Sequence, residues 1–249
     1  MFIQNSYRFA SAVADARFMM KLQTVTSSEM FTLGIGGGTF NYTVDWGDGS
    51  SLETYTTGAN ISHVYSTIGE YIMKINGQCP HIAMAFAPGG ANRNIPRDII
   101  NWGSQQWGSF FYFMWQCPNV TVTALDYPDL SNASTLRNSF RGCSVLDIVN
   151  INNWDFSTIT NINDMFTDTN FNRSLGGIDM NQITNFGTIN NLDTTNYDST
   201  LIGWASQTPL TNRSVSFGSS QYTLGGSAES ARNTLINTYG WTITDGGGI

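Results

Sequence analysis

Internal repetition is the sequence feature that most restricts the fold of this 249-residue chain. A large apolar residue, followed three positions later by a small one, recurs every 26 residues. The copies are Met114-x-x-Cys117, Phe140-x-x-Cys143 and Phe166-x-x-Thr169. A fixed period of about 20–50 residues is typical of solenoids, whose units bury their apolar side chains only by stacking on their neighbours. The period therefore predicts a stack of coils in the second half of the chain.

The same period holds at other positions. Asp129-Leu130-Ser131 matches Asp155-Phe156-Ser157, and Leu136 matches Ile162. In the following unit we expect the register to slip by about one residue. That unit continues the apolar pattern with Ile183, Phe186 and Ile189.

The cysteines fit the same scheme. Cys79, Cys117 and Cys143 are an odd number, and none lies in a C-x-x-C arrangement. Cys117 and Cys143 hold equal positions in successive units, so we expect them to stack in the interior as free thiols, with Thr169 next in the column. A disulfide between them stays an alternative, because stacked coils lie about 5 Å apart and a disulfide needs Cα atoms within about 7 Å.

One unit carries a longer motif. It reads Asn153-Trp154-Asp155-Phe156-Ser157-Thr158-Ile159-Thr160-Asn161-Ile162-Asn163-Asp164-Met165-Phe166 and is followed by Phe171-Asn172. This segment resembles the BspA-type leucine-rich repeat, whose units read W-D-V-S-x-V-x-x-M-x-x-M-F and then F-N. The segments 196–205, 221–223 and 231–247 resemble the C-terminal cap of such arrays. The resemblance implies a short leucine-rich-repeat-like solenoid over residues 87–191 and an α/β cap over residues 192–249.

A cap is also expected on physical grounds. The last coil of a solenoid would otherwise leave an apolar end and open strand edges exposed. We expect a helix from Ala228 to Tyr239, with Ser227 as its N-cap and Gly240 as the residue that ends it. A second helix is expected over residues 197–206, although Gly203 within it disfavours a helix.

Short strands separated by turns fill the region between Phe18 and Phe86. Residues 31–35 alternate between apolar and small or polar side chains, and the glycine run 36–38 follows them. In the next segment one face of a predicted strand is formed by Phe40, Tyr42, Val44 and Trp46.

Three separated motifs in this region point to a known family. They are Trp46-Gly47-Asp48-Gly49-Ser50, His63-x-Tyr65 and Gly69-x-Tyr71. Together they resemble a PKD domain, an immunoglobulin-like sandwich common in surface-exposed and extracellular proteins, although the family's W-x-F-G-D-G is compressed here. The resemblance implies a mainly β fold with a PKD-like β-sandwich over residues 18–86. We expect Ala87 to Gly90 to be a linker, and residues 1–17 to form an N-terminal arm.

Composition excludes several classes of function. Charged residues make up 12% of the chain, about half of the roughly 25% that is usual, and the formal net charge is −7. Scattered basic residues argue against nucleic-acid binding, which needs clustered ones, and no apolar stretch reaches the 18 or so residues of a membrane span. Asn, Ser, Thr and Gly replace the charges and can satisfy backbone groups at coils and turns. They leave a neutral surface suited to glycans or to protein subunits.

Few residues offer catalytic or metal chemistry. His63 and His81 are the only histidines and no cysteine pair has ligand spacing, so we expect no metal and no cofactor. Asp45 and Asp48 fit a structural turn better than a calcium site, which stays the alternative. Repeat or cap positions account for Asp129, Asp155 and Asp198, so we expect no enzyme. A carboxylate pair for glycoside hydrolysis stays open, because tertiary distance sets such pairs.

The aromatic run from Trp107 to Trp115 allows two interpretations. It can fill the first coil and pack against the sandwich, or it can form a platform for sugar rings or a partner. We favour packing, and expect Trp102 and Trp107 to stay partly exposed as the residues that contact a partner or glycan.

These observations predict a non-catalytic, surface-exposed structural or binding module. Residues 1–20 contain no continuous apolar segment typical of a signal peptide. BspA-like proteins on bacterial cells resemble adhesins and need export, whereas modules on phage particles are released by lysis. We therefore expect a phage virion component, a capsid or tail decoration that contacts the host surface. The alternative is a bacterial cell-surface or secreted adhesin that binds glycan or protein.

The expected partners follow from that placement. Residues 1–17 are expected to dock onto other virion proteins, capsid or tail subunits, in a homo-oligomeric or multi-copy assembly. Host-surface glycan or protein is a second expected partner, and nucleic acid is not expected.

Overall fold

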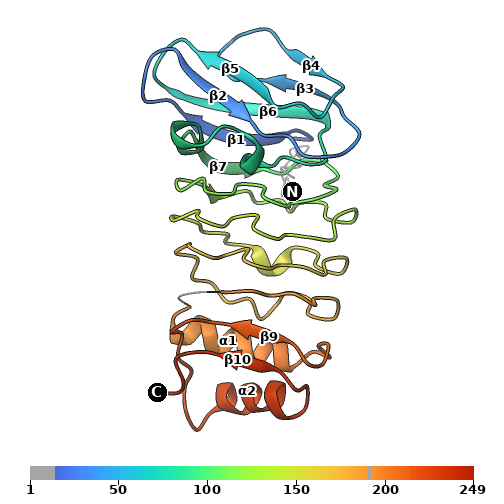
Figure 1. Cartoon of the computed structure of the whole chain (residues 1–249), viewed down its shortest axis with the longest axis vertical. Helices are drawn as coiled ribbons and strands as arrows, with labels where there is room; N and C mark the ends of the chain where they lie inside the picture. The colour runs from blue at the N-terminus through green and yellow to red at the C-terminus, as the bar shows by residue number, and fades with distance from the viewer. Residues whose placement is uncertain (1–14, 190–191) are drawn as a thin grey trace, which may run out of the picture.

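The computed structural model describes residues 15–189 and 192–249. The chain is mainly β and forms an elongated stack (Figure 1). Sheets lie at one end, successive coils follow, and two helices with short strands lie at the other end. The predicted docking arm falls on residues 1–14, which lie outside the described residues, and on residues 15–17. The amide of Asn101 donates to the carbonyls of Asp15 and Arg17, at 2.8 and 2.7 Å, and fixes that last part.

The larger sheet has six strands in the order β4-β3-β6-β1-β7-β8. Strand β1 pairs antiparallel with both β6 and β7, and β7 pairs parallel with β8. The bounds are β1 (Phe18–Gln23), β3 (Asn41–Asp45), β4 (Glu53–Tyr55), β6 (Glu70–Gln78), β7 (Pro96–Asn101) and β8 (Thr121–Val122).

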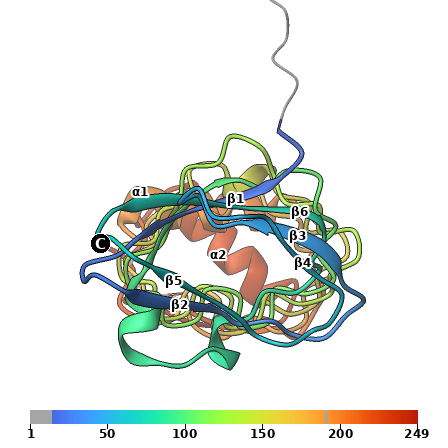
Figure 2. The ribbon, with the colours of Figure 1, turned by 90° about the horizontal axis from the view of Figure 1, so that it is seen from above.

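A two-stranded antiparallel sheet, β2 (Glu29–Leu33) and β5 (Ile61–Tyr65), faces the larger one. Seen from above, β2 and β5 lie along one side and β1, β3 and β6 along the other (Figure 2). The Phe31 and Trp46 rings meet between them, with centroids 6.5 Å apart, and the Tyr65 hydroxyl donates to the Trp46 carbonyl at 3.0 Å. The predicted inward face is confirmed, because Phe40, Tyr42, Val44 and Trp46 are all buried.

The turn after Trp46 is structural, as the sequence predicts. Gly47 and Gly49 adopt φ values of +83° and +85°, which favour glycine. Asp45 and Asp48 accept hydrogen bonds from the backbone of Gly47 and Ser50, at 2.9 and 3.0 Å. The second Asp48 oxygen lies 2.7 Å from the His63 ring.

The predicted linker at residues 87–90 is wrong. The 3-10 helix η1 (Met84–Phe86) precedes it, a second one, η2 (Gly90–Asn94), begins within it at Gly90, and the chain then enters the six-stranded sheet as β7. Buried Asn92 accepts from the Thr32 backbone nitrogen at 2.6 Å and donates to the Thr32 carbonyl at 3.0 Å. The free edge of β1 needs a hydrogen-bonding partner, and β7 supplies it. One apolar core therefore runs from Phe18 to Trp241 without interruption.

Successive coils are joined by parallel bridges. Thr135 pairs with Asn161, and Asn161 pairs with Asn185. The first step is 26 residues, but the second is shorter by two, so the expected slip of about one residue is wrong. A single 3-10 turn, η3 (Ile151–Asn153), lies within the described coils.

The coils turn at two recurring backbone positions. At both, the residues adopt positive φ values of 54–79°, a region that few residue types tolerate. The first position is held by Tyr112, Asn138 and Asp164, and the second by Gln116, Gly142 and Asp168. The period therefore reflects backbone geometry as well as apolar spacing.

The three cysteines are buried free thiols, as expected. Cys143 donates from Sγ to the Met114 carbonyl of the preceding coil at 3.1 Å. Burial raises the pKa of Cys117 to about 12, which keeps the thiol protonated and unreactive at neutral pH.

The last part of the chain contains α1 (Thr194–Ala205), β9 (Ser214–Ser216), α2 (Ser227–Asn237) and β10 (Thr242–Thr244). Both predicted helices form, but Ser227 is not the N-cap of α2. Gly226 holds that place without a side-chain hydrogen bond. Glu229 in the first turn instead accepts from the Gly225 backbone nitrogen just before the helix, at 2.8 Å, and its negative charge suits the positive end of the helix dipole.

Gly203 in α1 has a packing reason. A Cβ built there would lie 2.2 Å from the carbonyl oxygen of Gly176, so the helix can approach the last coil only with glycine at this position. The indole of Trp204 then donates to the Leu175 carbonyl at 2.8 Å. The close approach outweighs the low helix propensity of glycine.

We predict that Gly142→Ala lowers the free energy of unfolding by about 1–2 kcal/mol, because alanine is strained at positive φ. Its Cβ would also lie 3.2 Å from Gln116 Cα. Urea denaturation followed by tryptophan fluorescence measures the change. Gly37→Ala is the matched control, since nothing lies within 4 Å of that Cβ. An equal loss in both variants would contradict the assigned role of the turn.

Candidate functional surfaces

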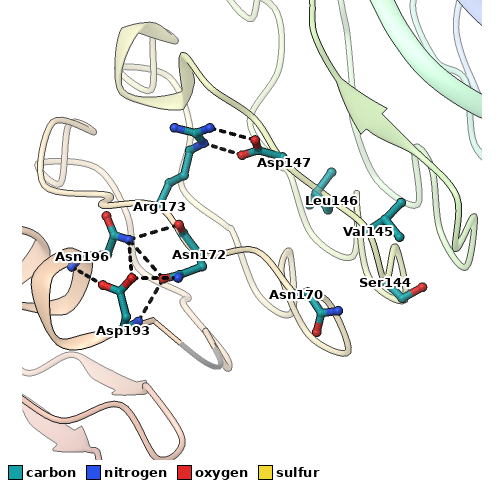
Figure 3. Close-up of a pocket in the computed structure, with 9 residues that line it drawn as sticks. All are labelled: Ser144, Val145, Leu146, Asp147, Asn170, Asn172, Arg173, Asp193 and Asn196. Carbon is teal, nitrogen blue, oxygen red and sulfur yellow. Dashed lines mark hydrogen bonds and ion pairs between the residues drawn. The ribbon is translucent and has the colours of Figure 1, made fainter.

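A shallow polar pocket of about 480 Å³ lies where the coils meet α1 (Figure 3). It is formed by residues 144–147 of one coil, residues 170, 172 and 173 of the next coil and residues 193 and 196 at the start of α1. Its lining residues are Ser144, Val145, Leu146, Asp147, Asn170, Asn172, Arg173, Asp193 and Asn196.

The polar groups of this pocket already bind one another. Arg173 donates to both carboxylate oxygens of Asp147, in one case at 2.8 Å, and this pairing lowers the pKa of Asp147. Asp193 accepts from the Asn196 backbone nitrogen at 2.8 Å and from the Asn172 amide at 2.9 Å. These bonds, that to the Asn196 backbone above all, lower the pKa of Asp193.

That electrostatic arrangement does not fit glycoside hydrolysis. A glycosidase needs one carboxylic acid with a raised pKa and one carboxylate. Asp147 and Asp193 are both shifted toward the ionised form and both have fixed partners. The polar groups of the pocket therefore join the coils to the start of α1.

The other candidate carboxylates are also engaged in local bonds. Asp129 and Asp155 accept from the backbone nitrogens of Ser131 and Ser157, at 3.0 and 2.9 Å, and these serines lower both pKa values. Asp198 accepts from the Thr223 backbone at 3.0 Å and from its hydroxyl at 2.6 Å. Their repeat and cap positions are thus structural, as predicted.

The two histidines have structural partners as well. His63 stacks on Trp46 with ring centroids 5.0 Å apart. His81 is buried, its Nε2 lies 2.9 Å from the Phe111 carbonyl oxygen, and burial lowers its pKa. Within residues 15–189 and 192–249, no three His, Cys, Asp or Glu side chains gather where they could hold a metal ion.

Trp102 and Trp107 do not reach the surface, which corrects the expectation that they stay partly exposed. Both are fully buried. Their rings lie 5.9 Å apart, and each packs on Phe18 of β1, at 6.0 and 5.3 Å. The six-stranded sheet lies next to the first coil, and large side chains are needed to fill the space between them. The two indoles fill it, so they cannot contact a partner there.

The aromatic run divides between the interior and the surface. Trp107, Phe110, Phe113 and Met114 point inward and are buried, so the packing interpretation holds for this half. Phe111, Tyr112 and Trp115 are only half-buried. The sequence analysis did not predict that Phe111, Tyr112 and Trp115 would point outward.

These outward side chains join three others in what we call the aromatic–arginine surface. It consists of Phe86, Arg93, Phe111, Tyr112, Trp115 and Arg137. Tyr112 is central, with ring centroids 4.1 Å from Phe111, 5.6 Å from Trp115 and 6.5 Å from Phe86. Phe86 at its edge is 49% exposed.

Two arginines lie over these rings. The Arg93 guanidinium carbon is 4.3 Å from the centre of the Trp115 ring, and that of Arg137 is 5.7 Å from the centre of Phe111. Both distances fall within the range of cation–π contacts. The sequence offered one signal for this surface, because residues one period after the outward aromatics are polar. Phe86 and Arg93 come from an earlier segment, and only the fold brings them here.

The most buried ion pair lies in the cap. Arg232 donates to the two oxygens of Asp245 at 2.7 and 3.2 Å, and the Tyr197 hydroxyl donates at 2.6 Å. The Asp245 side chain is 4% exposed. Burial alone would raise the pKa of Asp245, but the bonds from Arg232 and Tyr197 outweigh it and the pKa is lowered. The pair fastens α1 and α2 to the last strand.

We predict that Asp245→Asn lowers the free energy of unfolding at pH 7 by about 2–4 kcal/mol, because Arg232 loses its buried partner. The stabilisation by Asp245 is complete above its unfolded pKa of about 3.9 and is lost as the pH falls through the lower folded pKa. The difference in the free energy of unfolding between wild type and variant should therefore shrink below about pH 4. Urea denaturation at several pH values measures it, with exposed Asp168→Asn as the control. A gap that stays constant down to acid pH would contradict the ion pair.

Comparison with known proteins gives one family match. Residues 108–223 match a family described as Mycoplasma protein of unknown function, DUF285. The match covers slightly less than half of the chain, lies within the coils and the cap, and is compatible with BspA-like surface repeats. It does not include residues 18–86, so the PKD resemblance stays a prediction. No curated protein and no solved structure matches the chain.

None of the helices in the described part of the chain is both long and apolar enough to span a bilayer.

Proposed function

We propose that this protein is a non-catalytic, surface-exposed binding or structural module. One contrast supports the proposal most: the carboxylates and histidines serve structural bonds, whereas half-exposed aromatic and arginine side chains gather on one outer wall. Buried or paired acids suit a scaffold, and exposed aromatic side chains suit recognition. The family match is compatible with a surface protein.

The proposal includes a finer description of the fold. We assign the first two sheets to a PKD-like, immunoglobulin-type sandwich and the coils to a BspA-like leucine-rich-repeat solenoid with an α/β cap. The glycine turn after Trp46 and its bond to His63 support the first assignment. The parallel bridges at 26 residues support the second.

The proposed location is a phage virion, where the protein would decorate the capsid or tail and contact the host surface. This rests on the resemblance of its units to modules of phage particles, and residues 1–17 are the proposed docking segment. A bacterial cell-surface or secreted adhesin remains the second candidate, because the neutral, amide-rich outer wall also suits glycan or protein binding.

We predict that antibodies against the full chain label intact phage particles from the source host in immunogold electron microscopy. Many gold particles per virion are expected, because a decoration is present in multiple copies. Particles from a phage that lacks the gene are the control. Label confined to the outer surface of bacterial cells would support the adhesin instead.

A second measurement tests the absence of catalysis. The purified chain should release no reducing ends from a panel of polysaccharides, since no carboxylate described above fits a general acid. Hydrolysis abolished by Asp147→Asn or Asp193→Asn would contradict the proposed function.

A further inference from the structure

We propose that the aromatic–arginine surface is a docking site for another protein that presents a carboxylate side chain beside an apolar one. The inference names the partner class of the module and therefore rests on the proposed function.

The fold does not require aromatic side chains at these outward positions. One period after Phe111, Tyr112 and Trp115 the chain has Arg137, Asn138 and Arg141, and a further period on it has Asn163, Asp164 and Thr167. The backbone bonds are the same in each case: Tyr112 donates to the Arg137 carbonyl at 3.2 Å, and Asn138 donates to the Asn163 carbonyl at 3.0 Å. Polar residues therefore support the same backbone bond at the next level, and the same positive φ at the next two.

Tyr112 also carries backbone strain. Its φ is 59°, in the left-handed region that Asn, Asp and Gly tolerate best. The equivalent positions are held by Asn138 and Asp164, which suit that conformation. A bulky residue there costs about 1–2 kcal/mol, and such strain concentrates at functional sites. The aromatic ring is thus kept where the backbone disfavours it.

The arginines of the surface are available to a carboxylate. Among the residues that the structure describes, no carboxylate lies within 4.0 Å of the Arg93 or Arg137 guanidinium, whereas Arg141 lies 3.5 Å from Asp168. Arg93 donates only to the side chain of Gln116, at 2.8 Å. The Nε atom of Arg93 is buried, so this guanidinium offers a partner only part of its donors. In a chain of net charge −7, the exposed Arg137 guanidinium can bind a carboxylate in a bidentate manner.

A protein partner fits these observations better than a glycan. The surface combines Trp, Tyr, Phe and Arg and contains no Lys, Asp or Glu, which is the composition of energetically important protein interfaces. Arg93 covers one face of the Trp115 ring, and a sugar would need such a face for stacking. The exposed Phe86 at the edge suits an apolar side chain of the partner.

The first experiment separates folding from binding. The triple variant Phe111→Asn, Tyr112→Asp, Trp115→Thr installs the residues of the third coil, and Tyr112→Asn installs that of the second. We expect both to remain folded, and Tyr112→Asn to unfold at a higher urea concentration than the wild type because its backbone strain is relieved. If both variants lose stability, the aromatics serve folding and the inference is wrong.

The second experiment identifies the partner chemistry. A library of short random peptides displayed on phage is selected on the full chain and counter-selected on the triple variant. We expect enriched peptides that place Asp or Glu beside Phe, Leu or Trp. Their dissociation constants should rise about tenfold or more in Arg137→Gln and Arg93→Gln, as for a lost bond to a charged group. Arg213→Gln, directly before β9 in the cap, is the matched control and should leave binding unchanged.

The remaining outcomes are distinguishable. A library that yields no Trp115-dependent peptide, or only peptides insensitive to Arg137, overturns the inference. Binding of glycans on an array that depends on Trp115 also overturns it, but leaves the proposed binding function intact. Hydrolysis of any polysaccharide would instead contradict the proposed function itself.

Discussion

Each coil of this protein depends on its neighbours for a closed interior. A coil is a single layer of chain, so its apolar side chains can leave water only by packing against the layers above and below. The ends of the stack must therefore be closed. At one end Trp102 and Trp107 pack against Phe18 of the first sheet, and at the other Trp204 packs 5.9 Å from Trp241. The same core continues through both ends.

The low charge of the chain follows from this architecture. Stacked layers present many backbone carbonyls, and short polar side chains reach those of the preceding layer. The hydroxyls of Thr160 and Thr184 donate to the carbonyls of Ser134 and Thr160, at 3.2 and 3.0 Å, and the Asn150 amide donates to Ala124 at 3.0 Å. Lys or Glu would be too long for these bonds and would lose side-chain entropy. Short polar side chains therefore occupy many positions between the coils, and the share of charged residues in the chain is low at 12%.

Local patterns in the sequence predicted much of the fold, because periodicity reports directly on which side chains are buried. The inward face of β3, the coil period, both helices of the cap and the free cysteines were all predictable from the residues themselves. The predictions failed where distant segments meet. Residues 87–90 read as a linker because Pro and Gly dominate locally, yet β7 directly after them completes the edge of β1. The register slip is two residues and not about one, because Asn161 pairs with Asn185, 24 residues later.

The candidate site was predicted only in part for the same reason. The aromatic run drew attention, but the two tryptophans expected to be exposed are buried, and the outward residues are others. A helical turn or coil presents side chains in directions that sequence spacing alone does not fix. Phe86 and Arg93 are separated from Trp115 along the chain, and only the packing of η1 and η2 beside the first coil brings them together. A comparison of equivalent positions between coils is the step that would have found Phe111, Tyr112 and Trp115.

Native-state hydrogen exchange in increasing urea tests most directly whether the stack is one structure closed at both ends. Mass spectrometry can follow the backbone amides of β1, of the coil strand around Asn161 and of β10 separately. The continuous core predicts that all three come to exchange through one common opening as urea rises. If β1 keeps its protection after the coils and β10 have opened at a much lower free energy, the sheets and the coils are independent and this account is wrong.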